Sequence, residues 1–289
     1  MRLFQSSITA ETLLLIEKYV PNIKLNVLRS YLVDGPGTCK IFTNACHCVD
    51  MIVLDSSTYS LFQGNHKCHI SLKTYADFLK NNYECYHAYF GFDPIHGNNG
   101  TEESITSQIY LESLGLHPVP VIQNLDLETD YYCKRHNHYN FVAIGSTRNK
   151  SEKDIKNAVK KLYDNGIKVH LFGVGSLIKL KDIPIWSSDC SSFARWVEVG
   201  RLVYFNGERE ITFSTSKFNT KGEKNDDFIE DSPYRDDYEN WVFEKFGLTL
   251  DKITHNHSMK MMVNSYYFYE LEKILQKIHI LNGFKFDNY

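Results

Sequence analysis

Residues 140–175 read NFVAIGSTRNKSEKDIKNAVKKLYDNGIKVHLFGVG, and this stretch decides the fold class. Two short runs in it, Asn140–Ile144 and Lys168–Phe172, are largely apolar, which is typical of strands buried on both faces. Between them lies a predicted helix that a Ser151 cap begins and Gly166 ends. Its apolar residues repeat at the spacing of one helix face: Ile155, Ala158, Val159 and Leu162. The stretch therefore predicts a strand–helix–strand unit of a parallel sheet.

The same alternation of short β-branched or aromatic runs with helical segments recurs outward along the chain. With the two runs above included, the predicted strands are Lys24–Leu32, Met51–Leu54, Tyr86–Phe92, Val119–Ile122, Asn140–Ile144, Lys168–Phe172, Ile183–Ser187 and Arg201–Tyr204. Eight such strands with helices between them close most simply into a (β/α)8 TIM barrel. This α/β barrel, with a short C-terminal helical extension, is the fold class that we predict.

The character of the chain changes after residue 217, which we take as the end of the barrel core begun at residue 1. Residues 218–237 are rich in Lys, Asp, Glu, Asn and Gly, which is typical of an exposed loop or linker. A helix that opens at Ser232-Pro233 and a long one from about Ser258 to Leu281 follow. We therefore expect residues 218–289 to form a linker and C-terminal helices that pack on the barrel.

The composition is that of a globular protein with no overall attraction to polyanions. The chain has 289 residues, of which 43% are hydrophobic and 23% charged, and 32 Lys plus Arg against 35 Asp plus Glu give a net charge of -3. Its apolar runs are far shorter than the roughly 18 residues that a membrane span needs, and the N-terminus does not read as a signal peptide. Seven cysteines, an odd number, fit reduced thiols. We expect a cytoplasmic protein without a membrane partner.

In a β/α barrel, reactive groups lie at the C-terminal ends of the strands, so polar residues that follow the apolar runs are the candidate site. These residues are Asp55, Asp93, Gln123, Gly145, Ser146, Gly173 and Asp189. Each aspartate alone is typical of a cap or a turn, but together at strand ends they point to chemistry. Two carboxylates that face one site suit glycosidic chemistry, in which one attacks or stabilises the sugar C1′ and the other handles the leaving group's proton.

The segment LDSSTYS at residues 54–60 resembles the Asp-Ser-Gly-Gly-Phe motif of tRNA-guanine transglycosylases. It is more similar to the Leu-Asp-Ser-Gly-Ala-Phe version in their phage and bacterial 7-deazaguanine DNA transglycosylase relatives. Further segments match that superfamily in order: the Asp93 turn, Val121-Ile122-Gln123, Ile144-Gly145, and Phe172-Gly173-Val174-Gly175 followed by Asp189-Cys190. The match covers roughly Met51 to Trp196.

The resemblance implies a transglycosylase that cuts guanine from a polynucleotide and inserts a free 7-deazaguanine base such as preQ0 or preQ1. By the match, Asp189 is the nucleophile that forms a covalent adduct with C1′, and Asp55 is the general acid/base. Asp93 accepts hydrogen bonds from the base's Watson–Crick edge, with Gln123 and the backbone at Gly145 on its carbonyl side. Further substrate-binding candidates at these motifs are Ser56, Ser146, His170 and Gly173. Without the resemblance, a lone histidine in an apolar strand such as His170 is typical of a hydrogen-bonded core residue.

Departures from the motifs keep several functions open. Ser57-Thr58 replace the small pair beside the reacting base, and Ser146 replaces the second glycine of its turn. The tRNA branch carries a C-terminal zinc site of three cysteines and a histidine, but no cysteine follows Cys190 here, which favours DNA as the polymer. The alternatives are a transglycosylase acting on tRNA, a non-catalytic barrel that binds a nucleotide or a partner protein, and an unrelated barrel hydrolase or lyase.

No cofactor is expected, because base exchange needs no redox carrier. A zinc site is the one metal alternative, since thiolate and imidazole ligands gather in one stretch: Cys39, Cys46, His47, Cys48, His66, Cys68 and His69. Their spacing matches no established zinc motif, so we predict no metal ligands.

Clustered basic residues near the predicted rim are the candidate nucleic-acid contacts: Arg148, Lys150, Lys179, Lys181 and Arg195, with Lys153 and Arg201 beside them. Local phosphate contacts are compatible with a net charge of -3, because affinity follows clustered Lys and Arg rather than totals. A target guanine would have to leave the stack to reach a barrel site, where an aromatic side chain could stack on it: Tyr59, Phe62, Phe92 or Trp196. The sequence leaves the oligomeric state open.

Overall fold

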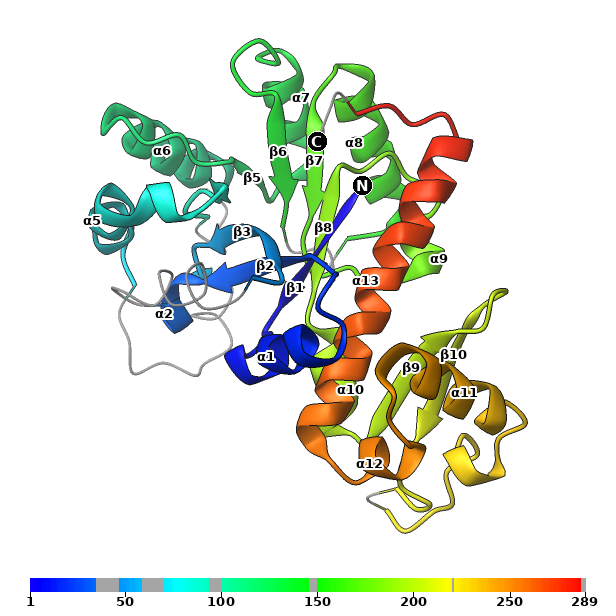
Figure 1. Ribbon diagram of the computed structural model, residues 1–289. Coiled ribbons are helices and arrows are strands. Elements are labelled where there is room, and N and C mark those ends of the chain that lie inside the picture. The colour runs from blue at the N-terminus through cyan, green and yellow to red at the C-terminus, as the bar shows by residue number, and fades with distance from the viewer. Residues whose placement is uncertain (35–46, 59–69, 94–99, 146–149, 220, 287–289) are drawn as a thin grey trace.

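Eight parallel strands form one curled sheet in the computed structural model, which describes residues 1–34, 47–58, 70–93, 100–145, 150–219 and 221–286 (Figure 1). The strands are β1 (Arg2–Ser6), β2 (Leu25–Ser30), β3 (Val49–Asp55), β4 (Ala88–Tyr89), β5 (Val121–Ile122), β6 (Phe141–Ile144), β7 (Lys168–Leu171) and β8 (Ser187–Cys190). Their order in the sheet is β4-β3-β2-β1-β8-β7-β6-β5. A parallel bridge between Phe90 and Val119 joins the β4 and β5 edges. The predicted (β/α)8 barrel is therefore confirmed.

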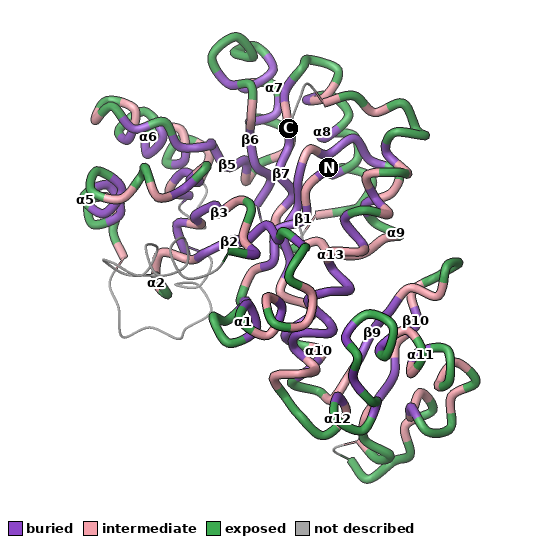
Figure 2. The backbone as a smooth tube through the Cα atoms, viewed as in Figure 1, coloured by how far each residue is buried: buried purple, intermediate pink, exposed green. Residues whose placement is uncertain are grey.

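Helices alternate with these strands: α1 (Ala10–Tyr19), α2 (Tyr31–Asp34), α5 (Leu72–Asn82), α6 (Gly100–Ser113), α7 (Leu125–Cys133), α8 (Glu152–Asp164), α9 (Leu177–Leu180) and α10 (Ser192–Glu198). A 3₁₀ helix, η1 (Tyr83–Cys85), precedes β4. Helix α8 follows the sequence prediction closely, because the Ser151 side chain accepts from the Asp154 backbone N–H at its start and its predicted apolar face is buried. Figure 2 shows the strands as the most buried part of the chain, with exposed stretches on the helices around them.

The strand prediction is wrong at both ends of the chain. Arg2–Ser6, which we did not predict as a strand, is β1, and it pairs with β2 and β8 at the centre of the sheet order. The predicted eighth strand at Arg201–Tyr204 instead belongs to β9 (Arg201–Phe205), which pairs antiparallel with β10 (Glu210–Ser214) outside the barrel. An apolar run specifies extended backbone but not its partner strand. The run predicted at Ile183–Ser187 also lies too early, since β8 begins at Ser187.

Strand β9 of the β9–β10 hairpin packs against α10 and α13, and three further elements follow the hairpin in the chain: η3 (Ile229–Asp231), α11 (Arg235–Phe246) and α12 (Leu250–Thr254). Rings from the hairpin and from α11 meet in one aromatic cluster: Tyr204, Phe213, Tyr238 and Trp241. In Figure 1 this group lies at the lower right, beyond α10.

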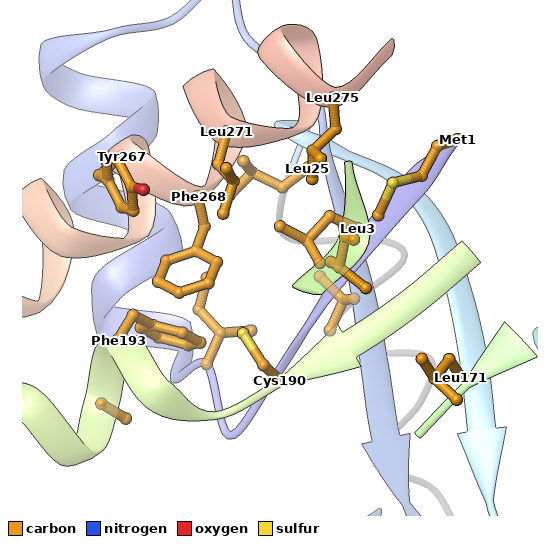
Figure 3. Packing of buried hydrophobic residues seen from close by; sticks show 14 of the residues in the cluster. Met1, Leu3, Leu25, Leu171, Cys190, Phe193, Tyr267, Phe268, Leu271 and Leu275 are labelled. Atoms are coloured by element: carbon orange, nitrogen blue, oxygen red, sulfur yellow. The ribbon is translucent and has the colours of Figure 1, made fainter. Parts of the chain in front are cut away.

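The long helix α13 (His257–Leu281) takes the position of the eighth barrel helix, because it packs along β1 and contacts both α1 and α9. Figure 3 shows its apolar side chains facing Leu3 and Leu25. Gln5 Nε2 donates to the Ser265 carbonyl and the Leu3 backbone N–H donates to Glu272 Oε2, at 2.9 and 2.7 Å. The helix therefore runs antiparallel to β1, with its C-terminal half beside the start of that strand.

Two buried clusters make up the hydrophobic core. The smaller one comprises Phe4, Leu28, Val53, Phe90, Val119, Val121 and Ala143. These side chains come from strands around the whole sheet, so this cluster fills the barrel interior. The larger one packs the outer faces of the strands against the helices. Among the described residues, none of the helices has both the length and the apolar character needed to cross a bilayer.

Candidate active site

Three aspartates lie at the C-terminal ends of β3, β4 and β8. Asp189 is paired in register with Phe4, whose side chain fills the barrel interior, so Asp189 faces the same interior. Asp55 ends β3 two residues after Val53, another interior residue, and the two therefore share a face. Asp93 follows β4 and is buried. The fold thus gathers the three carboxylates that the sequence placed at strand ends.

The carboxylates of Asp93 and Asp189 act electrostatically on Asp55. Desolvation is the largest cause that raises the pKa of Asp55, and the neighbouring carboxylates of Asp93 and Asp189 add to it, giving a pKa of about 7. Desolvation also raises the pKa of Asp93 to about 6. A carboxyl group with a pKa near 7 both gives and takes protons at neutral pH, which is the property that a general acid/base needs.

Asp189 is held at one of its two carboxylate oxygens. The Gly173 backbone N–H donates to Asp189 Oδ1 at 2.9 Å, and His170 Nε2 lies 3.4 Å from the same oxygen. His170 is fully buried, and its other ring nitrogen lies 2.8 Å from Ser187 Oγ. The rings of Phe90 and Phe172 flank it. His170 and Gly173 therefore contact Asp189, and the buried ring of His170 is not placed for the direct substrate contact that we predicted.

Asp93 and Gln123 are hydrogen-bonded to each other. Gln123 Nε2 and Thr58 Oγ1 both donate to the Asp93 carboxylate, and Ser56 Oγ lies 3.3 Å from Asp93 Oδ1. The Gln123 backbone N–H donates to Glu128 Oε2 at 2.8 Å, which anchors the residue that ends β5. A base bound between Asp93 and Gln123 would replace the bond that they make to each other.

Sequence reasoning missed the supporting roles of Thr58 and Glu128. Thr58 carried a signal, because it lies in the same motif as Asp55, where we interpreted it as a replacement that narrows the site. No feature of the sequence marked Glu128, because an acidic residue in the first turns of a helix is typical of any helix N-terminus. In the structure Glu128 is fully buried, and burial raises its pKa.

Both backbone groups of Gly145, which we predicted to read a base, have hydrogen-bond partners within the protein. Its N–H donates to the Ile122 carbonyl at 3.0 Å, and its carbonyl accepts from Lys150 Nζ at 2.6 Å. A Cβ at this position would lie 2.3 Å from Gln123 Nε2, so glycine lets the Gln123 side chain lie against the backbone here. Lys150 is half-buried, and burial lowers its pKa while Glu128 and Asp93 oppose that shift.

Ser57 adopts a strained backbone conformation beside Asp55. Its φ of 68° lies in the left-handed region, which favours glycine, and the motif that this segment resembles has glycine there. The strain is compensated by hydrogen bonds: the Ser57 N–H donates to Asp55 Oδ2 and the Leu32 N–H donates to Ser57 Oγ, both at 3.0 Å. Such strain, held in place by surrounding contacts, is common at functional sites.

The predicted nucleic-acid contacts are spread widely. Lys179 lies 3.4 Å from Glu152 in an exposed ion pair, and Arg195 is exposed on α10. Lys181 lies near the opposite end of the barrel, because its carbonyl accepts from Asn282 at the end of α13. Of the predicted contacts that the structure describes, it therefore brings only Lys150 near the carboxylates. The predicted residues Ser146 and Arg148 lie outside the described part of the chain, as do Tyr59 and Phe62.

The zinc alternative is only partly covered by the structure. Cys48 is buried, and its thiol contacts the Leu13 carbonyl at 3.6 Å. Most of the other candidate ligands lie outside the described residues: Cys39, Cys46, His66, Cys68 and His69. Within the described ranges, no three His, Cys, Asp or Glu side chains cluster so that they could hold a metal ion.

Comparison with known protein families and curated proteins identified no relative of the chain. No family model matches the chain, and no curated protein matches it.

Proposed function

We propose that the chain is a transglycosylase that exchanges guanine in a polynucleotide, with DNA favoured, for a 7-deazaguanine such as preQ0. The observation that carries this proposal is the set of three aspartates at one end of the barrel. One of them, Asp189, is held at a single oxygen, and another, Asp55, has a pKa of about 7. The ordered motifs that resemble the tRNA-guanine transglycosylase superfamily support the same assignment of roles.

In the first step of the proposed reaction, an Asp189 oxygen attacks C1′ of the target nucleotide and the bond from C1′ to N9 of guanine breaks. The bonding electron pair leaves with guanine, and Asp55 supplies the proton that the leaving base takes up. The Gly173 N–H holds Asp189 Oδ1 and His170 Nε2 lies 3.4 Å from it, which leaves Oδ2 to form the new bond. In the second step, N9 of the incoming base attacks C1′, Asp55 takes back a proton, and the Asp189 carboxylate is released.

DNA is the favoured polymer because the segment at Asp55 is more similar to the Leu-Asp-Ser-Gly-Ala-Phe motif of the DNA-acting relatives than to the motif of the tRNA branch. The experiment that tests the proposal measures incorporation of labelled guanine and labelled preQ0 into duplex DNA and into tRNA, side by side. The variant is Asp189→Asn, and Asp182→Asn is the matched control, since Asp182 is an exposed aspartate of the segment before β8. We expect incorporation into DNA that falls by at least about 10³-fold in Asp189→Asn and is unchanged in Asp182→Asn.

Other outcomes assign other functions. Incorporation into tRNA alone would keep the mechanism and reverse the choice of polymer. Full activity of a folded Asp189→Asn protein would contradict the proposed nucleophile. Binding of guanine without incorporation into either polymer would favour the non-catalytic barrel.

A further inference from the structure

Ser187 carries a fully buried hydroxyl that the reaction steps above do not use. It begins β8 two residues before Asp189, so the two side chains share the interior face of that strand. His170 on the neighbouring strand β7 is paired with Ser187 in register, and Ser187 Oγ lies 2.8 Å from His170 Nδ1. The three side chains therefore form a chain of contacts that leads from the barrel interior to the proposed nucleophile.

The second ring nitrogen of His170 faces the Asp189 carboxylate. This atom, Nε2, is buried, lies 3.4 Å from Asp189 Oδ1 and makes no hydrogen bond of ordinary geometry within the described residues. An ionised carboxylate only accepts hydrogen bonds, so the contact is attractive when Nε2 carries the proton. In a neutral ring Nδ1 then has a lone pair, and the Ser187 hydroxyl is placed to donate to it.

The surroundings of the imidazole make the Ser187 contact important. The rings of Phe4, Phe90 and Phe172 pack around it. A ring nitrogen left without a partner among such apolar groups costs free energy. Which nitrogen of a histidine carries the proton is set by the hydrogen bond that the other nitrogen makes. The Ser187 hydroxyl therefore determines both the proton position and the orientation of the ring.

We propose that Ser187 is a positioning residue for the nucleophile. Its hydroxyl donates to His170 Nδ1, keeps the ring proton on Nε2, and so presents a second donor to Asp189 Oδ1 beside the Gly173 N–H. This inference rests on the proposed function, because it takes Asp189 as the nucleophile. It deepens that function by adding a residue that acts on the reaction without touching substrate.

The two donors at Oδ1 act mainly on the second step of the exchange. In that step the bond between C1′ and Asp189 Oδ2 breaks, and its electron pair returns to the carboxylate. Donors at Oδ1 stabilise this returning charge, whereas in the first step they stabilise the charge that attack removes. Loss of a donor therefore slows breakdown of the adduct more than its formation, so the adduct accumulates. A merely misplaced Asp189 would instead slow both steps.

The first test is ¹⁵N NMR of histidine-labelled protein without substrate, with the His170 signals assigned by their absence from His170→Gln. Wild type is compared with Ser187→Ala and with Ser187→Thr, which keeps the hydroxyl. The matched control is Ser104→Ala, since Ser104 is buried on α6 and its hydroxyl has no partner within the described residues. We expect a protonated Nε2 and a hydrogen-bonded Nδ1 in all but Ser187→Ala, which loses the Nδ1 hydrogen bond and shares the proton between both nitrogens.

The second test measures exchange and the share of protein that carries the adduct during turnover. We expect kcat of Ser187→Ala to fall about three- to tenfold, the equivalent of one ordinary hydrogen bond, while the adduct share rises. Ser187→Thr should restore most of the rate, and Ser104→Ala should match the wild type. If Ser187→Ala does not fold, Ser187→Cys takes its place, because a thiol is a weak donor.

Several results would overturn the inference: a wild-type ring protonated at Nδ1 or at both nitrogens, an unchanged spectrum in Ser187→Ala, or a lower adduct share in that variant. The NMR measurement needs no activity, so it separates this inference from the proposed function. The expected spectra without exchange in any of the proteins would contradict the proposed function and leave standing the hold of Ser187 on His170.

Discussion

The two ends of the barrel each bury carboxyl groups, and they do so in opposite ways. Near the start of β1, Glu272 accepts from the Leu3 backbone N–H and from Asn26 Nδ2, at 2.7 and 2.8 Å. The charged groups that act on it are the cations Lys273 and Arg2. At the other end, the charged groups that act on Asp55 are the carboxylates of Asp93 and Asp189.

From this difference we infer that Glu272 has a structural role and that the three aspartates form the reactive site. Glu272 ties α13 to β1 and β2, and its hydrogen-bond partners offset the cost of burial. Burial is the largest cause that raises the pKa of Asp55 toward neutrality, and the negative charges of Asp93 and Asp189 raise it further, which costs stability. Sites at which acids raise one another's pKa are more common where chemistry occurs than where a fold is merely held together.

Asp55→Asn is expected to have the largest effect on the exchange rate. We expect the exchange rate to fall by about 10²- to 10⁴-fold, because the proton donor is lost. In the wild-type protein the rate is expected to decrease as pH rises through about 7, where Asp55 gives up its proton. A rate that is flat from pH 6 to pH 8 would contradict the role of Asp55.

The same variant has an opposite effect on stability. Because folding raises the pKa of Asp55, ionising this carboxyl costs more free energy in the folded chain than in the unfolded chain. This cost is fully present above about pH 7 and disappears at low pH. Asp55→Asn is therefore expected to raise the free energy of unfolding at pH 8 by about 1–2 kcal/mol, a figure discounted because Asp55 is partly exposed. The gain should shrink as pH falls from 7 to 4, as measured by urea unfolding at each pH.

Glu272→Ala tests the structural end of the barrel. It leaves the Leu3 N–H and the Asn26 amide without their buried acceptor, so we expect the free energy of unfolding to fall by about 2–3 kcal/mol. The exchange rate of the protein that remains folded should change less than about threefold. A Glu272→Ala protein that lost activity while keeping its stability would contradict a purely structural role of Glu272.

His170→Phe is expected to lower the exchange rate less than Asp55→Asn does. A phenyl ring fits the aromatic surroundings of Phe90 and Phe172 but loses the Nε2 contact with Asp189. We expect kcat to fall about tenfold with little change in KM, because His170 is a positioning residue that does not touch substrate. His170→Gln, which keeps a donor, should recover part of the rate, whereas equal rates in the two variants would mean that His170 only packs.

Much of the site could be predicted because barrel strands end in polar residues. Asp55 and Gln123 directly follow buried apolar runs, and the carboxyl ends of parallel strands meet at one end of a barrel. The roles of Lys150 and Glu128 could not be predicted, since both depend on which side chains meet across loops. A half-buried lysine and a surface lysine look the same in a sequence.

The barrel could be predicted from the sequence, but not all of its strands could. Arg2–Ser6 is too short and too polar at its ends to read as a central strand, although Leu3, Phe4 and Gln5 are all buried. Arg201–Tyr204 has a stronger strand pattern, yet it pairs in a hairpin. Local pattern specifies extended backbone, and only tertiary contacts decide which edge it joins.

Trapping a covalent adduct between Asp189 and a nucleotide is the sharpest test of the proposed nucleophile. The protein is incubated with duplex DNA and separately with tRNA, without incoming base, then denatured and analysed by peptide mass spectrometry. We expect a nucleic-acid adduct on the peptide that carries Asp189, formed with DNA and missing in Asp189→Asn but present in Asp182→Asn. An adduct on Asp55, or efficient exchange of labelled guanine with no adduct on any residue, would contradict the account.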